Sequence, residues 1–299
     1  MTRQMPTEEI SSRYLDLDSW SSREVVAALY EGQLAAAAAV HGALDSIAAA
    51  VDDAVAALAR GGRIVYVGAG TSGRIGVQDG SELVPTYGWP EDRLVFAIAG
   101  GPDALMRSVE GAEDSETAGA AAIADAGIGA DDVVIAVAAS GTTPYTLGAL
   151  RAAAAAAAVT VAVAANPGAP LLAVARHPIL VATGSEAIAG STRMKAGTAQ
   201  KIVLNLLSTA VMVRLGRVYR GLMVHMRARN AKLRRRAAAI VDRVVGCGRD
   251  EAARLVEAAG GDVKTAVLIG FGMAPDEAAR LLERHAGNLR GAIAAIGRD

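Results

Sequence analysis

A glycine-rich segment directly after an apolar run has the composition of an anion-binding loop. It reads Gly68-Ala69-Gly70-Thr71-Ser72-Gly73-Arg74, with hydroxyl side chains where a helix would begin. Backbone N–H groups at a helix start bind anions because they have no partner within the helix. We therefore expect this segment to bind a phosphate group through Gly70, Thr71 and Ser72.

The same segment matches the Gly-x-Gly-x-x-Gly fingerprint of dinucleotide-binding proteins. That fingerprint also requires an acidic residue at the end of the second strand, where it holds the ribose hydroxyls. The second apolar run ends Ala97-Ile98-Ala99-Gly100-Gly101 and offers no carboxylate. No Gly-Lys-Ser/Thr follows the loop, as an ATP-type phosphate loop would need. A dinucleotide enzyme is therefore the weakest interpretation, and no cofactor is expected.

A second segment of small hydroxyl residues follows the third apolar run, as Ser140-Gly141-Thr142-Thr143-Pro144. Proline at the first position of a helix presets the helix start. In open α/β sheets ligands bind at the carboxyl ends of the strands, so both loops would lie at one edge. A phosphorylated sugar touching both loops is the natural inference, with Ser140, Thr142 and Thr143 as further contacts.

Carboxylates that follow the first two apolar runs could transfer protons. Glu82 comes about two to three helical turns after the glycine loop. Glu113 lies in Val109-Glu110-Gly111-Ala112-Glu113-Asp114, where the glycine weakens a helix. Carboxylates can serve as acid and base if burial raises their pKa values toward the working pH. Most glutamates are surface residues, so position alone does not separate these two from that role.

Charged residues at the start of a long helical pattern mark another candidate site. Gly184-Ser185-Glu186 is followed by Gly190-Ser191-Thr192-Arg193-Met194-Lys195. Ser191 has the side chain of an N-cap, whereas cations in the first turn oppose the helix dipole unless an anion or a partner acid compensates. We therefore predict that four residues here contact the substrate: Glu186, Ser191, Arg193 and Lys195.

Short apolar runs alternate with segments of helical composition through the middle of the chain. Residues 63–67, 94–98, 133–138 and 159–164 have the pattern of buried parallel strands, and 178–181 is a weaker fifth. This alternation predicts an α/β fold with a doubly wound, parallel five-stranded sheet covered by helices on both faces.

Helical patterns flank this sheet on both sides in the sequence. Residues 22–60 are helical in character, with a break near Glu31-Gly32, and residues 191–215 and 224–245 each read as one long helix. The predicted organisation is a helical segment over 1–60, a phosphosugar domain over 61–223 and a small helical domain over 224–299.

The tail contains an internal repeat. Asp250-Glu251-Ala252-Ala253-Arg254-Leu255 recurs as Asp276-Glu277-Ala278-Ala279-Arg280-Leu281, an offset of 276 − 250 = 26 residues. Each copy reads as a helix, a Gly-Asp or Gly-Asn turn and a second helix, which resembles a ubiquitin-associated (UBA) bundle. A packing or dimer-supporting role is the preferred interpretation.

Bulk composition restricts the possible partners. The net charge is -1, which gives no electrostatic signature for nucleic acid or an anionic membrane. The single cysteine, Cys247, suits a reducing compartment and has no metal-ligand neighbours. The N-terminus has no apolar signal region, and the run 152–165 is too short to span a bilayer. The composition predicts a cytoplasmic protein with no membrane, nucleic-acid or metal partner.

Taken in order, these segments resemble the N-acetylmuramic acid 6-phosphate etherase family. The resemblance runs from about Thr7 to the C-terminus and rests on residues 68–76, 79–82, 109–114 and 190–201, of which Ser191 to Lys201 is the most specific. It implies a sugar-isomerase (SIS, flavodoxin-like) fold, a homodimer with sites near the subunit interface and no metal or nucleotide cofactor.

The resemblance also implies an activity within peptidoglycan recycling, a branch of amino-sugar metabolism. A lyase of this family cleaves the lactyl ether of N-acetylmuramic acid 6-phosphate, giving N-acetylglucosamine 6-phosphate and D-lactate by β-elimination and water addition. Glu82 matches the acid that protonates the departing lactate, and Glu113 matches the second essential glutamate, a candidate base.

Alternatives and departures accompany this resemblance. The runner-up function is a non-catalytic sugar-phosphate-binding regulator of the glucokinase-regulator type, and a phosphosugar isomerase is a third. Thr142 stands where the family commonly has Arg, and His225 replaces a usual Asp. The family's Asn-Pro is absent around residues 10–13.

Overall fold

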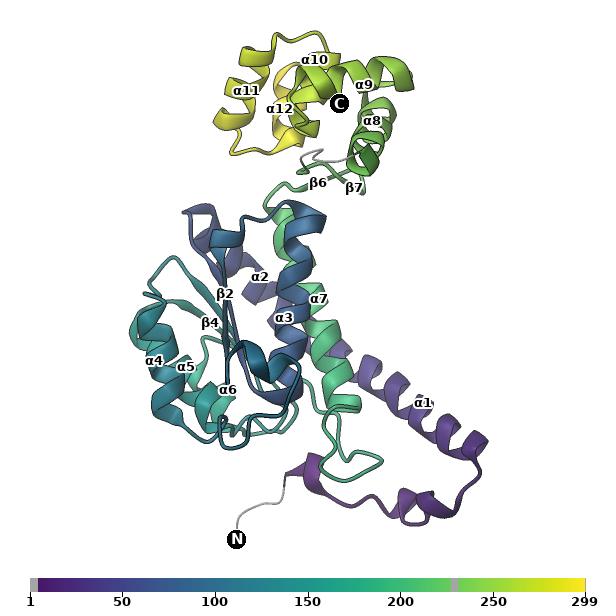
Figure 1. Cartoon of the computed structure of the whole chain (residues 1–299), viewed down its shortest axis with the longest axis vertical. Coiled ribbons are helices and arrows are strands. Elements are labelled where there is room, and N and C mark those ends of the chain that lie inside the picture. The colour runs from purple at the N-terminus through teal and green to yellow at the C-terminus, as the bar shows by residue number, and fades with distance from the viewer. Residues whose placement is uncertain (1–4, 227–230, 299) are drawn as a thin grey trace. The chain divides into compact units, whose positions relative to one another are not determined.

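The computed structural model describes residues 5–226 and 231–298 (Figure 1). These residues form two compact units. The first contains residues 1–81 and 91–208, and the second contains residues 82–90 and 209–299. The helical segment predicted over residues 1–60 therefore belongs to the sheet-containing unit, and the boundary expected at residue 223 lies inside the second unit.

The first unit is built on a five-stranded parallel sheet with strand order β2-β1-β3-β4-β5. All five predicted strands are confirmed to within one residue at each end. The strands are β1 (Ile64–Gly68), β2 (Leu94–Ile98), β3 (Val133–Val137), β4 (Val159–Ala164) and β5 (His177–Leu180). Every residue of β1, β3 and β4 is buried, as expected for inner strands covered on both faces.

Helices cover both faces of this sheet, which makes the fold doubly wound (Figure 1). Helices α4 (Glu116–Asp125), α5 (Pro144–Ala155) and α6 (Pro170–Val174) lie on one face. Helices α2 (Leu44–Ala59), α3 (Gly70–Tyr87) and α7 (Lys195–Arg214) lie on the other. The core between the sheet and α5 is aliphatic and rich in alanine, with Val65, Val134, Ala149 and Leu150 fully buried.

The N-terminal helices differ from their predicted form. Helix α1 (Ser22–Val40) continues through Gly32, and the break lies at a 3-10 turn, His41–Ala43, before α2. Gly32 does not interrupt α1. A Cβ at Gly32 would meet the alkyl chain of Lys195 at 3.4 Å, an ordinary van der Waals contact. Ser21 and Glu24 form a capping box that fixes the start of α1.

Two stretches are long and apolar enough to cross a membrane, namely Ser22–Ala59 and Lys195–Arg214. Over half of the most apolar window of α7 is buried within the protein, as for the core helix of a soluble domain. In the first stretch α2 packs against the sheet, whereas α1 exposes several apolar side chains.

The second unit contains a short hairpin, β6 (Val218–Tyr219) with β7 (Leu222–Met223), followed by five helices. These are α8 (Ala231–Val245), α9 (Arg249–Ala258), α10 (Val263–Gly270), α11 (Pro275–Arg284) and α12 (Leu289–Ala295). Helix α8 begins at Ala231, later than the predicted start at residue 224, and residues 224–226 after β7 are not helical. The two predicted helical hairpins are present. Asp262 and Asn288 occupy equivalent N-cap positions and accept hydrogen bonds from Thr265 and Gly291.

Candidate functional site

The glycine loop is the turn between β1 and α3. Helix α3 begins at Gly70, and its first backbone hydrogen bond joins Gly73 N to Ala69 O at 3.1 Å. The preceding N–H groups therefore lie before the helical ladder, as an anion site requires. Gly68 cannot carry a side chain, since a Cβ there would lie 2.9 Å from Gly73 N. Ser72 is buried and donates its hydroxyl hydrogen to Gln200 Oε1 at 3.0 Å.

The second hydroxyl loop lies beside the first, because Gly68 of β1 pairs with Val137 of β3. Ser140 Oγ accepts a hydrogen bond from Thr142 N at 3.2 Å, and Pro144 opens α5 as predicted. Gly141 has a φ of +68°, and a Cβ there would lie 2.4 Å from that of Ala169. The two loops therefore share the carboxyl edge of the sheet.

A cavity of about 360 Å³ opens beside the glycine loop. It brings together two residues predicted from sequence, Gly70 and Glu113, with Glu110 and two arginines that were not predicted, Arg74 and Arg107. The other predicted loop residues are outside its lining: Thr71, Ser72, Ser140, Thr142 and Thr143. The cavity thus offers carboxylates and guanidinium groups next to a helix start.

Arg74 holds one wall of this cavity in place. Its guanidinium donates to the carbonyl oxygens of Ala104 (2.9 Å), Leu105 (3.1 Å) and Arg107 (3.3 Å). The segment after β2 is therefore tied to α3. Arg74 is part of the glycine motif, but nothing in the sequence indicates that its partners would be backbone carbonyls.

Glu113 lies in the loop between β2 and α4, and its side chain is exposed. Its carbonyl oxygen accepts a hydrogen bond from Tyr145 N at 3.0 Å, in the first turn of α5. The segment that carries this glutamate is thus fixed to the helix that follows the second hydroxyl loop.

Glu82 is also exposed, but it is not among the residues that line the cavity. It lies on α3 twelve residues after Gly70, a separation of about 18 Å along a helix axis. One turn earlier, buried Asp79 accepts hydrogen bonds from Tyr66 (2.7 Å), Asn205 (2.8 Å) and Ser208 (3.2 Å). Burial, followed by the nearby Asp79 charge, raises the pKa of Tyr66 well above its ordinary value.

The start of α7 differs from the prediction. The helix begins at Lys195, so Ser191 is not its N-cap and lies instead in a turn, where Met194 N donates to Ser191 O. The cap is the buried carboxylate of Glu186, which accepts from Lys195 N and Ala196 N at 3.0 Å each. Its two oxygens each accept one of the free N–H groups at the start of α7, and its negative charge is favourable at this positive end of the helix dipole.

The side chains of Arg193 and Lys195 have different surroundings. Lys195 Nζ donates to the carbonyl oxygen of Thr183 at 2.9 Å, and Arg193 is exposed. Both oxygens of Glu186 are already engaged by the backbone. Contact of these residues with a substrate remains a prediction.

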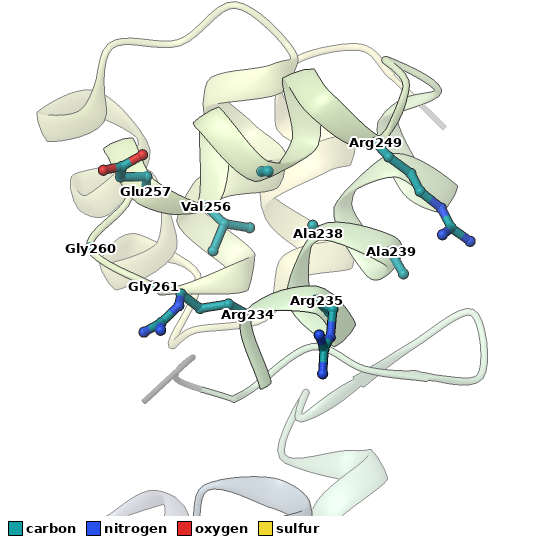
Figure 2. A pocket seen from close by; sticks show the side chains of 10 residues that line it. Arg234, Arg235, Ala238, Ala239, Arg249, Val256, Glu257, Gly260 and Gly261 are labelled. Atoms are coloured by element: carbon teal, nitrogen blue, oxygen red, sulfur yellow. The ribbon is translucent and has the colours of Figure 1, made fainter. Parts of the chain in front are cut away.

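A larger cavity lies in the second unit. It has a volume of about 720 Å³ and lies between α8 and α9 (Figure 2). Arg234, Arg235 and Arg249 line it together with alanines, and Glu257 is the one carboxylate among the described residues of its lining. It has neither a hydroxyl loop nor a carboxylate pair, so we do not assign the chemistry to it. No cluster of three or more His, Cys, Asp or Glu suited to a metal ion occurs among the described residues.

Comparison with known proteins finds relatives that share one name and a related domain. The family model for the glucokinase regulatory protein N-terminal SIS domain matches residues 46–154. An N-acetylmuramic acid 6-phosphate etherase from Deinococcus radiodurans is 54% identical over 269 residues, which cover 90% of this chain and 88% of that protein. The protein of the same name from Salmonella typhi is 47% identical over 263 residues, covering 88% and 89%.

Among solved structures, a phosphoheptose isomerase from Francisella tularensis superposes with a TM-score of 0.47 at 17% identity. The match covers 65% of this chain and 100% of that one.

Proposed function

This chain belongs to the N-acetylmuramic acid 6-phosphate etherase family, and on that premise we propose that it cleaves the D-lactyl ether of N-acetylmuramic acid 6-phosphate. The products are N-acetylglucosamine 6-phosphate and D-lactate. The observation that carries the proposal is that Glu113 and the glycine loop line one cavity at the carboxyl edge of the sheet.

The reaction needs a base and an acid at the sugar. In the ring-opened substrate the lactyl ether at C3 is β to the C1 aldehyde. Removal of the C2 proton gives an enolate, which expels lactate, and water then adds to the unsaturated aldehyde. We assign proton removal to Glu113 and protonation of the departing lactate to Glu82, since positioned carboxylates can perform both steps.

The phosphate group would anchor the open chain. We propose that the N–H groups of Gly70, Thr71 and Ser72 hold it at the start of α3, where the helix dipole favours a dianion. Ser140, Thr142 and Thr143, at the neighbouring strand end, would contact the sugar. Thr142 is exposed and lacks the charge of the arginine common in the family, so the backbone would carry more of the phosphate binding.

We also propose that the protein is a homodimer in which Glu82 of each copy acts in the site of the other. Glu82 lies twelve residues after Gly70 on α3 and is not among the residues that line the cavity, which supports its supply by a second copy. Val26 (65% exposed), Tyr30 (61%) and Leu34 (54%) form an apolar stripe along α1 at helical spacing. A partner subunit would remove this stripe from water.

The proposed reaction places the protein in the cytoplasm, in peptidoglycan recycling, because its substrate is a phosphorylated cell-wall sugar. The free thiol of Cys247 is compatible with this compartment.

The decisive experiment measures D-lactate release from N-acetylmuramic acid 6-phosphate in heavy-oxygen water. Elimination and rehydration would place the label at C3 of the sugar and none in lactate. Glu113→Gln should abolish release, whereas Glu110→Gln, a neighbour in the same cavity, should retain most of it. Binding of sugar phosphates without lactate release would instead favour the regulator.

A further inference from the structure

A buried amide on α7 contacts the glycine loop. Gln200 is 3% exposed, and its Oε1 accepts the hydrogen bond from the Ser72 hydroxyl. Its Nε2 has no hydrogen-bond partner among the described residues. A buried donor without an acceptor is rare in folded proteins and calls for an explanation.

Because of this contact, the Ser72 hydroxyl has no hydrogen left to donate to a phosphate group. A serine hydroxyl has one hydrogen, and Ser72 gives it to Gln200. Its oxygen can then only accept hydrogen bonds from a ligand. A phosphate dianion offers acceptor oxygens almost exclusively, so Ser72 in this arrangement cannot donate to it.

We propose that Gln200 is the positioning residue that makes Ser72 a donor to the substrate phosphate. When the phosphate binds, the amide turns over, so that Nε2 donates to Ser72 Oγ and the Ser72 hydrogen points to a phosphate oxygen. This inference rests on the proposed function, in which the phosphate binds at the start of α3.

The turn costs little and improves the hydrogen bonding of the amide. The two ends of a glutamine amide have nearly the same shape, and the terminal torsion has two broad, roughly equivalent minima. Before the turn both hydrogens of Nε2 are unpaired, whereas afterwards one is used and a carbonyl oxygen occupies the unpartnered position. The amide, the hydroxyl and the phosphate then form successive hydrogen bonds that all point the same way, and each bond polarises and strengthens the next.

The test is a double-mutant cycle on binding of N-acetylglucosamine 6-phosphate, measured by calorimetry. The proteins are wild type, Ser72→Ala, Gln200→Leu and the double variant. Each single substitution should weaken binding about tenfold, as for one hydrogen bond to a charged group, and the double variant should be no weaker than Ser72→Ala. Unphosphorylated N-acetylglucosamine should show no such difference.

Two further variants separate this role from a structural one. Gln200→Glu should bind the sugar phosphate more weakly than Gln200→Leu, because a carboxylate only accepts and repels the dianion. Ser208→Ala, a buried serine on the same helix, should bind like wild type. Additive losses in the double variant, or unchanged binding in Gln200→Leu, would overturn the inference alone. Failure of wild type to bind the sugar phosphate would overturn the proposed function as well.

Discussion

Tyr145 donates its backbone N–H to the carbonyl oxygen of Glu113 at 3.0 Å. The bond joins the segment after β2 to the first turn of α5, which itself follows the hydroxyl loop after β3. Two loops from different strands are thus held in one arrangement. The position of Glu113 therefore depends on how closely α4 and α5 pack, as well as on its own loop.

That packing depends on Gly119 in α4. A Cβ at Gly119 would lie 1.9 Å from the carbonyl oxygen of Tyr145, so α4 and α5 could not keep their present distance. We expect Gly119→Ala to lower the free energy of unfolding by about 1–3 kcal/mol, the usual cost of overpacking, and to reduce lactate release by displacing Glu113. Urea unfolding and the lactate assay measure the two effects.

Gly129→Ala is the matched control, because a Cβ there meets nothing within 4 Å. It should behave as wild type in both measurements. Full lactate release by a folded Gly119→Ala protein would show that the α4–α5 distance does not position Glu113.

Mixing two inactive variants tests the shared site. Glu82→Gln and Glu113→Gln should each release no lactate as homodimers. If Glu82 acts across the interface, unfolding and refolding the two together should produce heterodimers in which one site has both glutamates. Statistical mixing puts half of the dimers in that class, so about a quarter of all sites should be active. If heterodimers are verified by mass and no activity returns, both glutamates of a site must come from the same chain.

The sheet was predictable because its signals are local. The runs at β1, β3 and β4 are short, almost entirely apolar and followed by small residues, as is typical of parallel strands covered on both faces. The repeat in the tail was equally clear, since Asp262 and Asn288 are caps that act on neighbours three residues away. Local chemistry of this kind does not require knowledge of the tertiary fold.

The features of the structure that could not be predicted from the sequence depend on residues far apart in the chain. Ser191 has the right side chain for a cap, yet the cap is Glu186, which reaches α7 from a preceding loop. Gly32 appeared to end a helix, but α1 continues through it and packs near Lys195, which is far along the chain. The contact of Gln200 with Ser72 joins residues 128 positions apart and has no local pattern.

The cap also provides a test of what Glu186 does. Glu186→Gln leaves one carbonyl oxygen for two N–H groups and turns an NH₂ group toward the other. We expect the free energy of unfolding to fall by about 1–3 kcal/mol, with little change in KM for the sugar phosphate. Glu91→Gln, at an exposed glutamate, is the control and should change neither quantity. A raised KM at unchanged stability would instead show that Glu186 contacts the substrate.

The second unit should respond to pH through Lys264, which is 3% exposed and donates to the carbonyl oxygen of Gly287 in the second hairpin. Burial, followed by the charge of Arg217, lowers its pKa from 10.5 to about 8. Between these values the unfolded chain binds a proton that the folded chain does not. Stability should therefore rise as the pH increases from 8 to 10.5, by up to about 3 kcal/mol.

Lys264→Met isolates this effect, because methionine has a similar length and no charge to desolvate. Urea unfolding, followed by the fluorescence of the buried Trp89 in the same unit, should be recorded below, within and above this pH window. Below the window the variant should be the more stable protein, since wild type then buries a charged ammonium group. The difference in the free energy of unfolding between the two proteins should shrink as the pH rises through the window, because Lys264 of folded wild type is then neutral. Parallel pH profiles for the two proteins would mean that Lys264 keeps an ordinary pKa in the folded state.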